Sequence, residues 1–240
     1  MNQALRRELR VLQAWAVATS AGLAILCVSW LTEAQATRTR FDEIDVERIN
    51  IIDSDGKVRM VLANSARQAD AVIAGRVIAA GRSRPAGMLF FNQEGDEVGG
   101  LVYSGRAGAN GPDATASLTF DQFQQDQTVA LQYVEQSGRR RAGLAIIDRP
   151  TRPLTELADL VARREAATNA EDRAAIQANI EAFGQTKQRM YVGKNLEGDA
   201  TLTLADAEGR ERLVLSVDAA GTARIRFLDE ARNVVREIVP

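Results

Sequence analysis

The stretch TLTLADAEGRERLVLSVDAAGTARIRFL, residues 201–228, decides the fold of this chain. Three apolar segments, TLTLA, RLVLSV and ARIRFL, are separated in it by polar segments that begin at Asp206 and Asp218 and reach a glycine three residues later. Asn195 begins a similar segment before this stretch and Asp229 begins one after it, so turns recur every 11 or 12 residues. Short strands with turn signals at this spacing are typical of an antiparallel meander.

The same pattern occurs earlier in the chain, at 53–56, 92–95 and 135–138, each time between apolar segments. Asp or Asn at the first turn position, with Gly three residues on, suits a type I turn followed by a bulge. The sequence therefore predicts a mainly β protein built from antiparallel hairpin repeats. A sandwich, a barrel and a solenoid-like array all agree with this pattern.

Two segments interrupt the strand pattern. Residues 67–87 are rich in glycine and small residues, and we expect a long loop there with at most one short strand. Between 153 and 183 apolar residues recur at helical spacing, with Pro153 suited to a helix start and Gly184 to a helix end. Asn169 is a candidate cap for a second helix, so we expect a protruding helical hairpin at 154–167 and 170–183.

Near the N-terminus, residues 11–31 form a run of 21 residues without a charge. A helix of that length spans about 30 Å, the thickness of a bilayer core. Basic residues precede the run, which predicts a single-pass protein of the bacterial inner membrane with a cytoplasmic N-terminus and a periplasmic remainder. A cleaved signal peptide, ending at Ala36, is the alternative.

Two features of this run bear on how it would sit in a membrane. Trp15 and Trp30 lie towards its two ends, where they would be interfacial anchors. Ala14, Ala18 and Gly22 share one helix face, on which another helix could pack closely. The predicted organisation of the chain is then a tail at 1–10, a transmembrane helix at 11–31, a linker at 32–43, a β-hairpin-repeat domain at 44–150, a helical insertion at 151–184 and a C-terminal β-meander at 185–240.

Composition narrows the range of functions. The chain has 45% hydrophobic and 26% charged residues, which is typical of a folded protein, and its net charge of −2 argues against a nucleic-acid partner. It has no histidine and one cysteine, Cys27. These absences exclude imidazole-based catalysis, imidazole zinc sites and thiolate clusters. We therefore expect no catalytic residue, no metal and no cofactor.

Phrases such as FDEIDVERINIIDSDGKVRMVLAN and AGMLFFNQEGDEVGGLVYSG resemble a family of uncharacterised bacterial proteins that carry hairpin phrases after a short, often apolar N-terminal segment. The phrases SLTFDQFQQDQTVAL and RRAGLAIIDRP resemble the same family, so the resemblance covers about residues 41–150. The family has no assigned activity, and the resemblance implies no catalytic residue.

Three groups of residues are candidate sites. Asp121, Phe123 and Asp126 lie in the polar and aromatic stretch FDQFQQDQ, which suits a partner or sugar contact or a solvated connection. Clustered arginines could meet an acidic partner or anionic lipid headgroups, or form a solvated face: Arg139, Arg140, Arg141, Arg163 and Arg164. The turn at 53–56 resembles a calcium loop only in part, because position twelve from Asp53 is Asn64 rather than Glu.

Three functions agree with these observations. The favoured one is a non-catalytic accessory subunit, which docks onto a larger membrane complex, such as a photosynthetic or respiratory assembly, and contacts the lipid bilayer. The second is a membrane-anchored binding module for an envelope carbohydrate or peptide, for which exposed Tyr103, Phe123 and Tyr133 on one face would be evidence. The third is a hydrolase that uses carboxylates alone, which requires two acids about 5 to 9.5 Å apart in a pocket.

Overall fold

The computed structural model describes the backbone of residues 3–33, 39–78 and 81–240, and the side chains of 7–25, 39–78 and 81–240. Two compact units make up the chain, Met1–Asp45 and Val46–Pro240. The first contains the helix α1 (Gln3–Glu33), and the second contains every other described helix and strand.

The structure contradicts the membrane span expected at 11–31. Among the described residues, no helix combines the length and the apolar character that crossing a membrane requires. The run includes Gln13, Thr19 and Ser20, and many of its other residues are alanines, which contribute little apolar surface. The predicted transmembrane helix, and with it the single-pass inner-membrane location, is therefore wrong.

The residues predicted to anchor or pack the span are exposed on α1 or lie outside the described residues. Trp15 is exposed on α1, whereas the side chain of Trp30 and the predicted cleavage position Ala36 lie outside the described residues. Ala14, Ala18 and Gly22 are exposed on the helix, and no described atom beyond the helix backbone lies within 4 Å of where a Cβ on Gly22 would be. No packing partner for this face is seen in the described residues.

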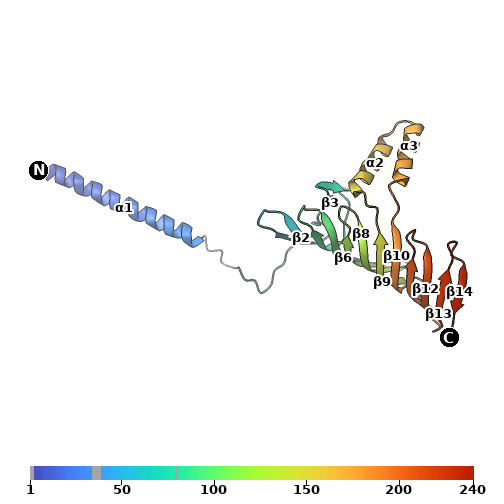
Figure 1. Ribbon diagram of the computed structural model, residues 1–240. Coiled ribbons are helices and arrows are strands. Elements are labelled where there is room, and N and C mark those ends of the chain that lie inside the picture. Colours follow the sequence, from blue (N-terminus) through green and yellow to red (C-terminus); the bar gives the residue numbers. More distant parts are fainter. Residues whose placement is uncertain (1–2, 34–38, 79–80) are drawn as a thin grey trace. The chain divides into compact units, whose positions relative to one another are not determined.

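One antiparallel sheet of twelve strands forms the second unit, as far as the chain is described. Its strands follow chain order: β1 (Arg48–Ile52), β2 (Val58–Ala63), β5 (Ala86–Phe91), β6 (Glu97–Gly108), β7 (Gly111–Asp121), β8 (Gln127–Gln136), β9 (Arg139–Asp148), β10 (Lys187–Lys194), β11 (Ala200–Ala205), β12 (Glu211–Val217), β13 (Ala223–Leu228) and β14 (Val234–Ile238). Figure 1 shows the strands succeeding one another along a single twisted layer. The predicted meander is confirmed, but in the described residues it is one open sheet with β1 and β14 at its two ends, so the predicted sandwich, barrel or solenoid-like closure is wrong.

The expected turn type is confirmed where Asp or Asn begins the turn and Gly ends it. At 53–56 the amide of Gly56 donates to the carbonyl of Asp53 at 2.9 Å, Gly56 has φ +82°, and the strand register shifts beside the turn. At 135–138 the prediction is wrong. There Gln136 pairs with Arg139, which leaves a two-residue loop whose residues both have positive φ, as in a type I′ turn.

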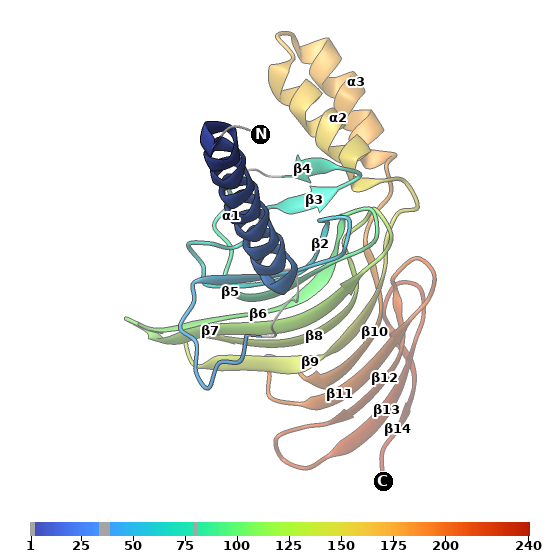
Figure 2. The same ribbon diagram turned by 90° about the vertical axis from the view of Figure 1, so that its left-hand side faces the viewer.

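Two insertions interrupt the sheet. Between β2 and β5 a small hairpin forms, β3 (Ala71–Ile73) and β4 (Arg76–Ile78), where the sequence had predicted a loop with at most one strand. Between β9 and β10 the expected helical hairpin is present as α2 (Leu154–Ala166) and α3 (Ala170–Glu181). The two insertions meet where Arg76 donates two hydrogen bonds to Asp159, at 2.8 and 2.6 Å (Figure 2).

The apolar core lies on one face of the sheet. Val61, Leu89, Ala130 and Ala145 are 0–4% exposed and belong to one row of cross-strand neighbours on that face. Ile73 of the small hairpin is also buried, and Phe183 is buried just after α3. We call this side the core face and the other side the open face.

Candidate functional site

The open face carries two complete rows of apolar side chains. The strand register aligns one residue from each strand into a row of aliphatic and methionine side chains: Ile49, Leu62, Met88, Leu101, Leu118, Leu131, Leu144, Val192, Leu202, Leu215, Ile225 and Ile238. The second row is apolar apart from a glycine and a terminal arginine: Ile51, Met60, Phe90, Gly99, Phe120, Val129, Ile146, Met190, Leu204, Leu213, Phe227 and Arg236. Such a face is normally the inner side of a two-layer fold.

These rows are accessible to solvent. Nine of their members are 37–52% exposed: Ile51, Leu62, Leu101, Phe120, Leu131, Val192, Leu204, Phe227 and Ile238. Together they expose on the order of 700 Å² of mostly apolar surface, whereas the largest apolar patch of an ordinary monomer is about 300–600 Å². The open face is therefore a candidate docking surface.

A polar groove of about 510 Å³ lies on the core face, over strands β10 to β13. Tyr191 forms part of its wall: the phenol oxygen lies 2.7 Å from the carbonyl oxygen of Lys194, and the Arg141 guanidinium stacks 4.5 Å from the ring centroid. Hydroxyl, acidic and apolar side chains line the rest of it together with Arg226, whose Nε is buried. This groove is a candidate ligand site.

A group of buried charges lies on the core face near the small hairpin. Arg84 and Glu97 form a two-bond ion pair, at 2.5 and 2.8 Å, in which both side chains are 13% exposed. Burial, followed by repulsion from Asp126 and Glu97, raises the pKa of Asp121 from 3.8 to about 7, although Arg149 and Arg84 oppose the rise. One carboxyl oxygen of Asp121 is buried without a hydrogen-bond partner among the described residues. Asp121 thus titrates near neutral pH.

The stretch FDQFQQDQ has a role that sequence reasoning missed. The side-chain amide of Gln122 donates to the carbonyl of Pro150, and that of Gln125 donates to the carbonyl of Arg152, both at 2.9 Å. The amide of Leu154 donates to the carbonyl of Gln124 at 2.8 Å. The glutamines therefore hold the start of the helical insertion, a contact between residues about 28 positions apart that no local pattern reveals.

Two of the predicted residues in this stretch, Asp121 and Asp126, lie close enough to interact, and Phe123 lies apart from them. Asp121 ends β7, and Asp126 lies in the following turn with its carboxylate 3.6 Å from Arg149. Phe123 is 60% exposed in the same turn. Neither acid lines the polar groove.

The predicted arginine clusters are divided by the fold. Strand alternation puts Arg140 on the face opposite to Arg139 and Arg141, and Arg140 pairs with Glu135 at 2.7 Å. Arg139 pairs with Glu197 at 3.2 Å. In the helical hairpin, Arg164 hydrogen-bonds Gln177 of α3 at 3.0 Å, and Arg163 is exposed. The five arginines form no single basic patch.

The aromatic residues proposed for a binding module lie apart. Tyr103 and Tyr133 both flank Ala116 on the open face, beside the apolar rows on the side away from Phe123. Tyr103 is 58% exposed, and the hydroxyl of Tyr133 donates to Glu135 at 2.7 Å. Two of the three therefore share a face, but they belong to the margin of the apolar rows rather than to the polar groove.

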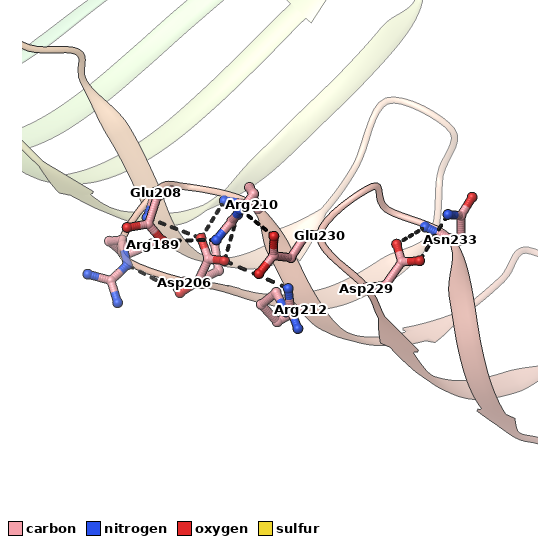
Figure 3. A network of polar contacts seen from close by, with 9 residues as sticks. Arg189, Asp206, Glu208, Arg210, Arg212, Asp229, Glu230 and Asn233 are labelled. Carbon is pink, nitrogen blue, oxygen red and sulfur yellow. Dashed lines mark hydrogen bonds and ion pairs between the residues drawn. The ribbon is translucent and has the colours of Figure 1, made fainter.

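Charged residues also connect neighbouring turns at the C-terminal end of the sheet. Arg210 lies 2.9 Å from Asp206, 3.2 Å from Glu208 and 3.1 Å from Glu230, so it bridges the turns at 206–209 and 229–232 (Figure 3). Within the described residues, no group of three or more His, Cys, Asp or Glu side chains is arranged to hold a metal. We interpret the network around Arg210 as structural.

The apolar rows and the groove were not predicted from the sequence. Alternation within each strand was visible, and the turn positions would have given the register needed to align the strands. Arg226 carried no signal, because arginine occurs throughout the chain. Comparisons with protein-family models, curated proteins and solved structures find no match for this chain. The resemblance to the hairpin-repeat family stays a prediction.

Proposed function

We propose that this protein is a non-catalytic accessory protein that docks onto a partner protein through its open face. The observation that supports the proposal most is the exposure of two apolar rows that cross the whole sheet. A solvent-exposed apolar surface of this kind is unfavourable in water, and a partner that covers it removes this unfavourable free energy. The sequence predicted an integral membrane complex as the partner, but that prediction depended on the span at 11–31. We therefore propose a partner protein and no membrane contact.

The chemistry of the face favours a protein with an apolar surface of similar area. About 700 Å² of exposed apolar side chain approaches the roughly 800 Å² that each partner contributes to a standard protein interface. Charged side chains occur in the two rows only at Arg236, at the edge strand. Interfaces that are permanent have apolar centres of this type, with polar residues at the rim.

A binding module is the second candidate function, because the polar groove offers a site for a small ligand on the opposite face. A carboxylate-only hydrolase has less support. Asp121 and Asp126 lie close enough to interact, but they line no part of that groove.

The proposal is tested with a photocrosslinking residue placed at Leu131 or Phe120 in the native cell. Both positions are about half exposed at the middle of the open face. The expected result is one defined partner protein at both positions, and loss of the assembly from native-size separation in Leu131→Glu. Val77→Glu is the matched control, because Val77 is 51% exposed on β4 of the small hairpin, outside the two rows.

Any of three other outcomes would overturn the proposal of a partner protein. Crosslinks between two copies of the chain, with the purified chain a dimer, would show self-association. Flotation of the purified chain with lipid vesicles, abolished by Leu131→Glu, would assign the face to lipid. A monomer without crosslinks from either position would show that the face docks to nothing under native conditions.

A further inference from the structure

The polar groove on the core face contains an arginine whose Nε has no partner in the described part of the chain. Arg226 lies on β13, between Val214 of β12 and Glu237 of β14. Its Nε is buried and has no hydrogen-bond partner among the described residues. A buried guanidinium NH without a partner costs free energy, so its retention requires an explanation.

The other two arginines in the groove wall are engaged. Arg232 lies 2.6 Å from Glu211, and Arg141 stacks on the ring of Tyr191. Arg226 forms no ion pair within the described part of the chain, although Glu237 is its cross-strand neighbour. That carboxylate lies instead 3.8 Å from Arg224. The one available positive group in the groove is therefore at Arg226, as far as the described residues show.

The other side chains of the groove wall indicate a ligand that carries hydroxyl groups as well as a negative charge. Besides Tyr191, three aliphatic hydroxyl side chains line the groove, Thr201, Thr203 and Ser216, and each can both donate and accept hydrogen bonds. Three carboxylates line it too, at Glu197, Asp199 and Glu211. They would repel a second negative charge on a ligand and accept hydrogen bonds from its hydroxyl groups.

From these contacts we propose that the groove binds a sugar acid, a small ligand with one carboxylate and several hydroxyl groups. The two terminal Nη groups of Arg226 receive the carboxylate, because Nε is buried, and their planar geometry suits two parallel hydrogen bonds. The hydroxyl and carboxylate side chains of the wall bind the ligand's hydroxyl groups. The volume of 510 Å³ lies within the range of ligand sites, about 300–1,000 Å³. This inference does not depend on the open face.

The test is calorimetric titration of the full chain with glucuronate, with glucose and inorganic phosphate as the comparison ligands. We expect glucuronate to bind with a dissociation constant at or below about 1 mM and glucose at least about tenfold more weakly. Arg226→Gln should weaken glucuronate binding at least about tenfold, and Arg226→Lys should weaken it less, because it keeps the charge and loses the fork. Arg236→Gln, a change of the same type on β14 in the open face, should leave binding unchanged.

Thermal unfolding separates a binding defect from a folding defect. Because Nε has no protein partner, Arg226→Gln should unfold at the same temperature as the wild type or higher. If that variant does not fold, Ser216→Ala provides the same test through the groove wall and should weaken glucuronate binding. The proposal is overturned by absence of glucuronate binding, by equal binding of glucose or phosphate, or by equal effects of Arg226→Gln and Arg236→Gln.

Discussion

Tyr191 and Gly143 show how single residues shape the core face. The Tyr191 ring lies over Gly143 of the neighbouring strand, and a Cβ on that glycine would be 2.6 Å from the ring and 2.5 Å from the carbonyl oxygen of Val192. The second of these is a backbone atom, so the clash cannot be relieved by moving a side chain alone. Glycine is required at position 143 because a side chain there would occupy the space of the Tyr191 ring.

Gly143→Ala is expected to destabilise the folded protein by about 1–3 kcal/mol, because it overpacks the contact beneath Tyr191. Denaturant unfolding followed by circular dichroism measures the change. Gly105→Ala is the matched control in a neighbouring part of the sheet, since its Cβ would be 3.5 Å from the nearest atom, an ordinary contact. Equal losses in the two variants would contradict this explanation.

Asp121 is expected to make stability depend on pH. Burial raises its pKa from 3.8 to about 7, so the folded protein keeps a proton that the unfolded chain releases at lower pH. Its contribution to stability is present below pH 3.8 and is lost progressively as pH rises towards 7. Asp121→Asn should remove this dependence and raise the free energy of unfolding by about 1–3 kcal/mol at neutral pH.

Unfolding of both proteins by urea at a series of pH values checks the prediction. The difference between variant and wild type should be smallest at about pH 3 and should grow up to about pH 7.5. The acidic end of the series is the internal control, because below pH 3.8 Asp121 is mostly protonated in both states. A constant difference across the series would show that Asp121 does not titrate in this range.

At the scale of the element, the α3 helix depends on its cap more than on packing. No residue of α3 is buried, whereas Asn169 accepts a hydrogen bond from the amide of Asp172 at 2.8 Å. The sequence had predicted this helix start from Asn169 with Asp172 three residues later. Local hydrogen bonding of this kind is readable from sequence, because both partners lie within one turn.

Asn169→Ala is expected to reduce the local stability of α3 by about 1 kcal/mol. Hydrogen exchange of the α3 amides measures this loss directly, without global unfolding. Asn179→Ala is the control, because Asn179 lies exposed inside the same helix and alanine is the better helix former there. Faster exchange in Asn179→Ala than in Asn169→Ala would contradict a capping role.

For the whole molecule, the two faces of the sheet should respond differently to the same substitution. Leu89 on the core face is 2% exposed, and Leu131 on the open face is 52% exposed. Leu89→Ala should cost about 2–4 kcal/mol of unfolding free energy, and Leu131→Ala less than about 1 kcal/mol. Equilibrium unfolding of the purified chain at low concentration measures both, and equal costs would show that the open face is covered in solution.

The local features of this fold were predictable from sequence, and the surfaces were not. The strands, most of the turns and the helical hairpin follow from periodicity, turn residues and Asn169, because each signal lies within a few residues. The membrane span was wrong, since an uncharged run was taken as sufficiently apolar. The small hairpin around Ile73 was missed, because three-residue strands carry almost no periodic signal.

By itself the sequence determined a mainly β chain of consecutive antiparallel hairpins with a helical insertion. Only the tertiary structure decided that the strands form one open sheet, that two apolar rows cross it, and that Arg226 lines a groove with its Nε buried. The reason is physical: turn and strand preferences are local, whereas a row or a groove depends on the register of many strands at once. A shift of one residue in the pairing of β8 would move Leu131 to the opposite face, and the same shift of β13 would move Arg226.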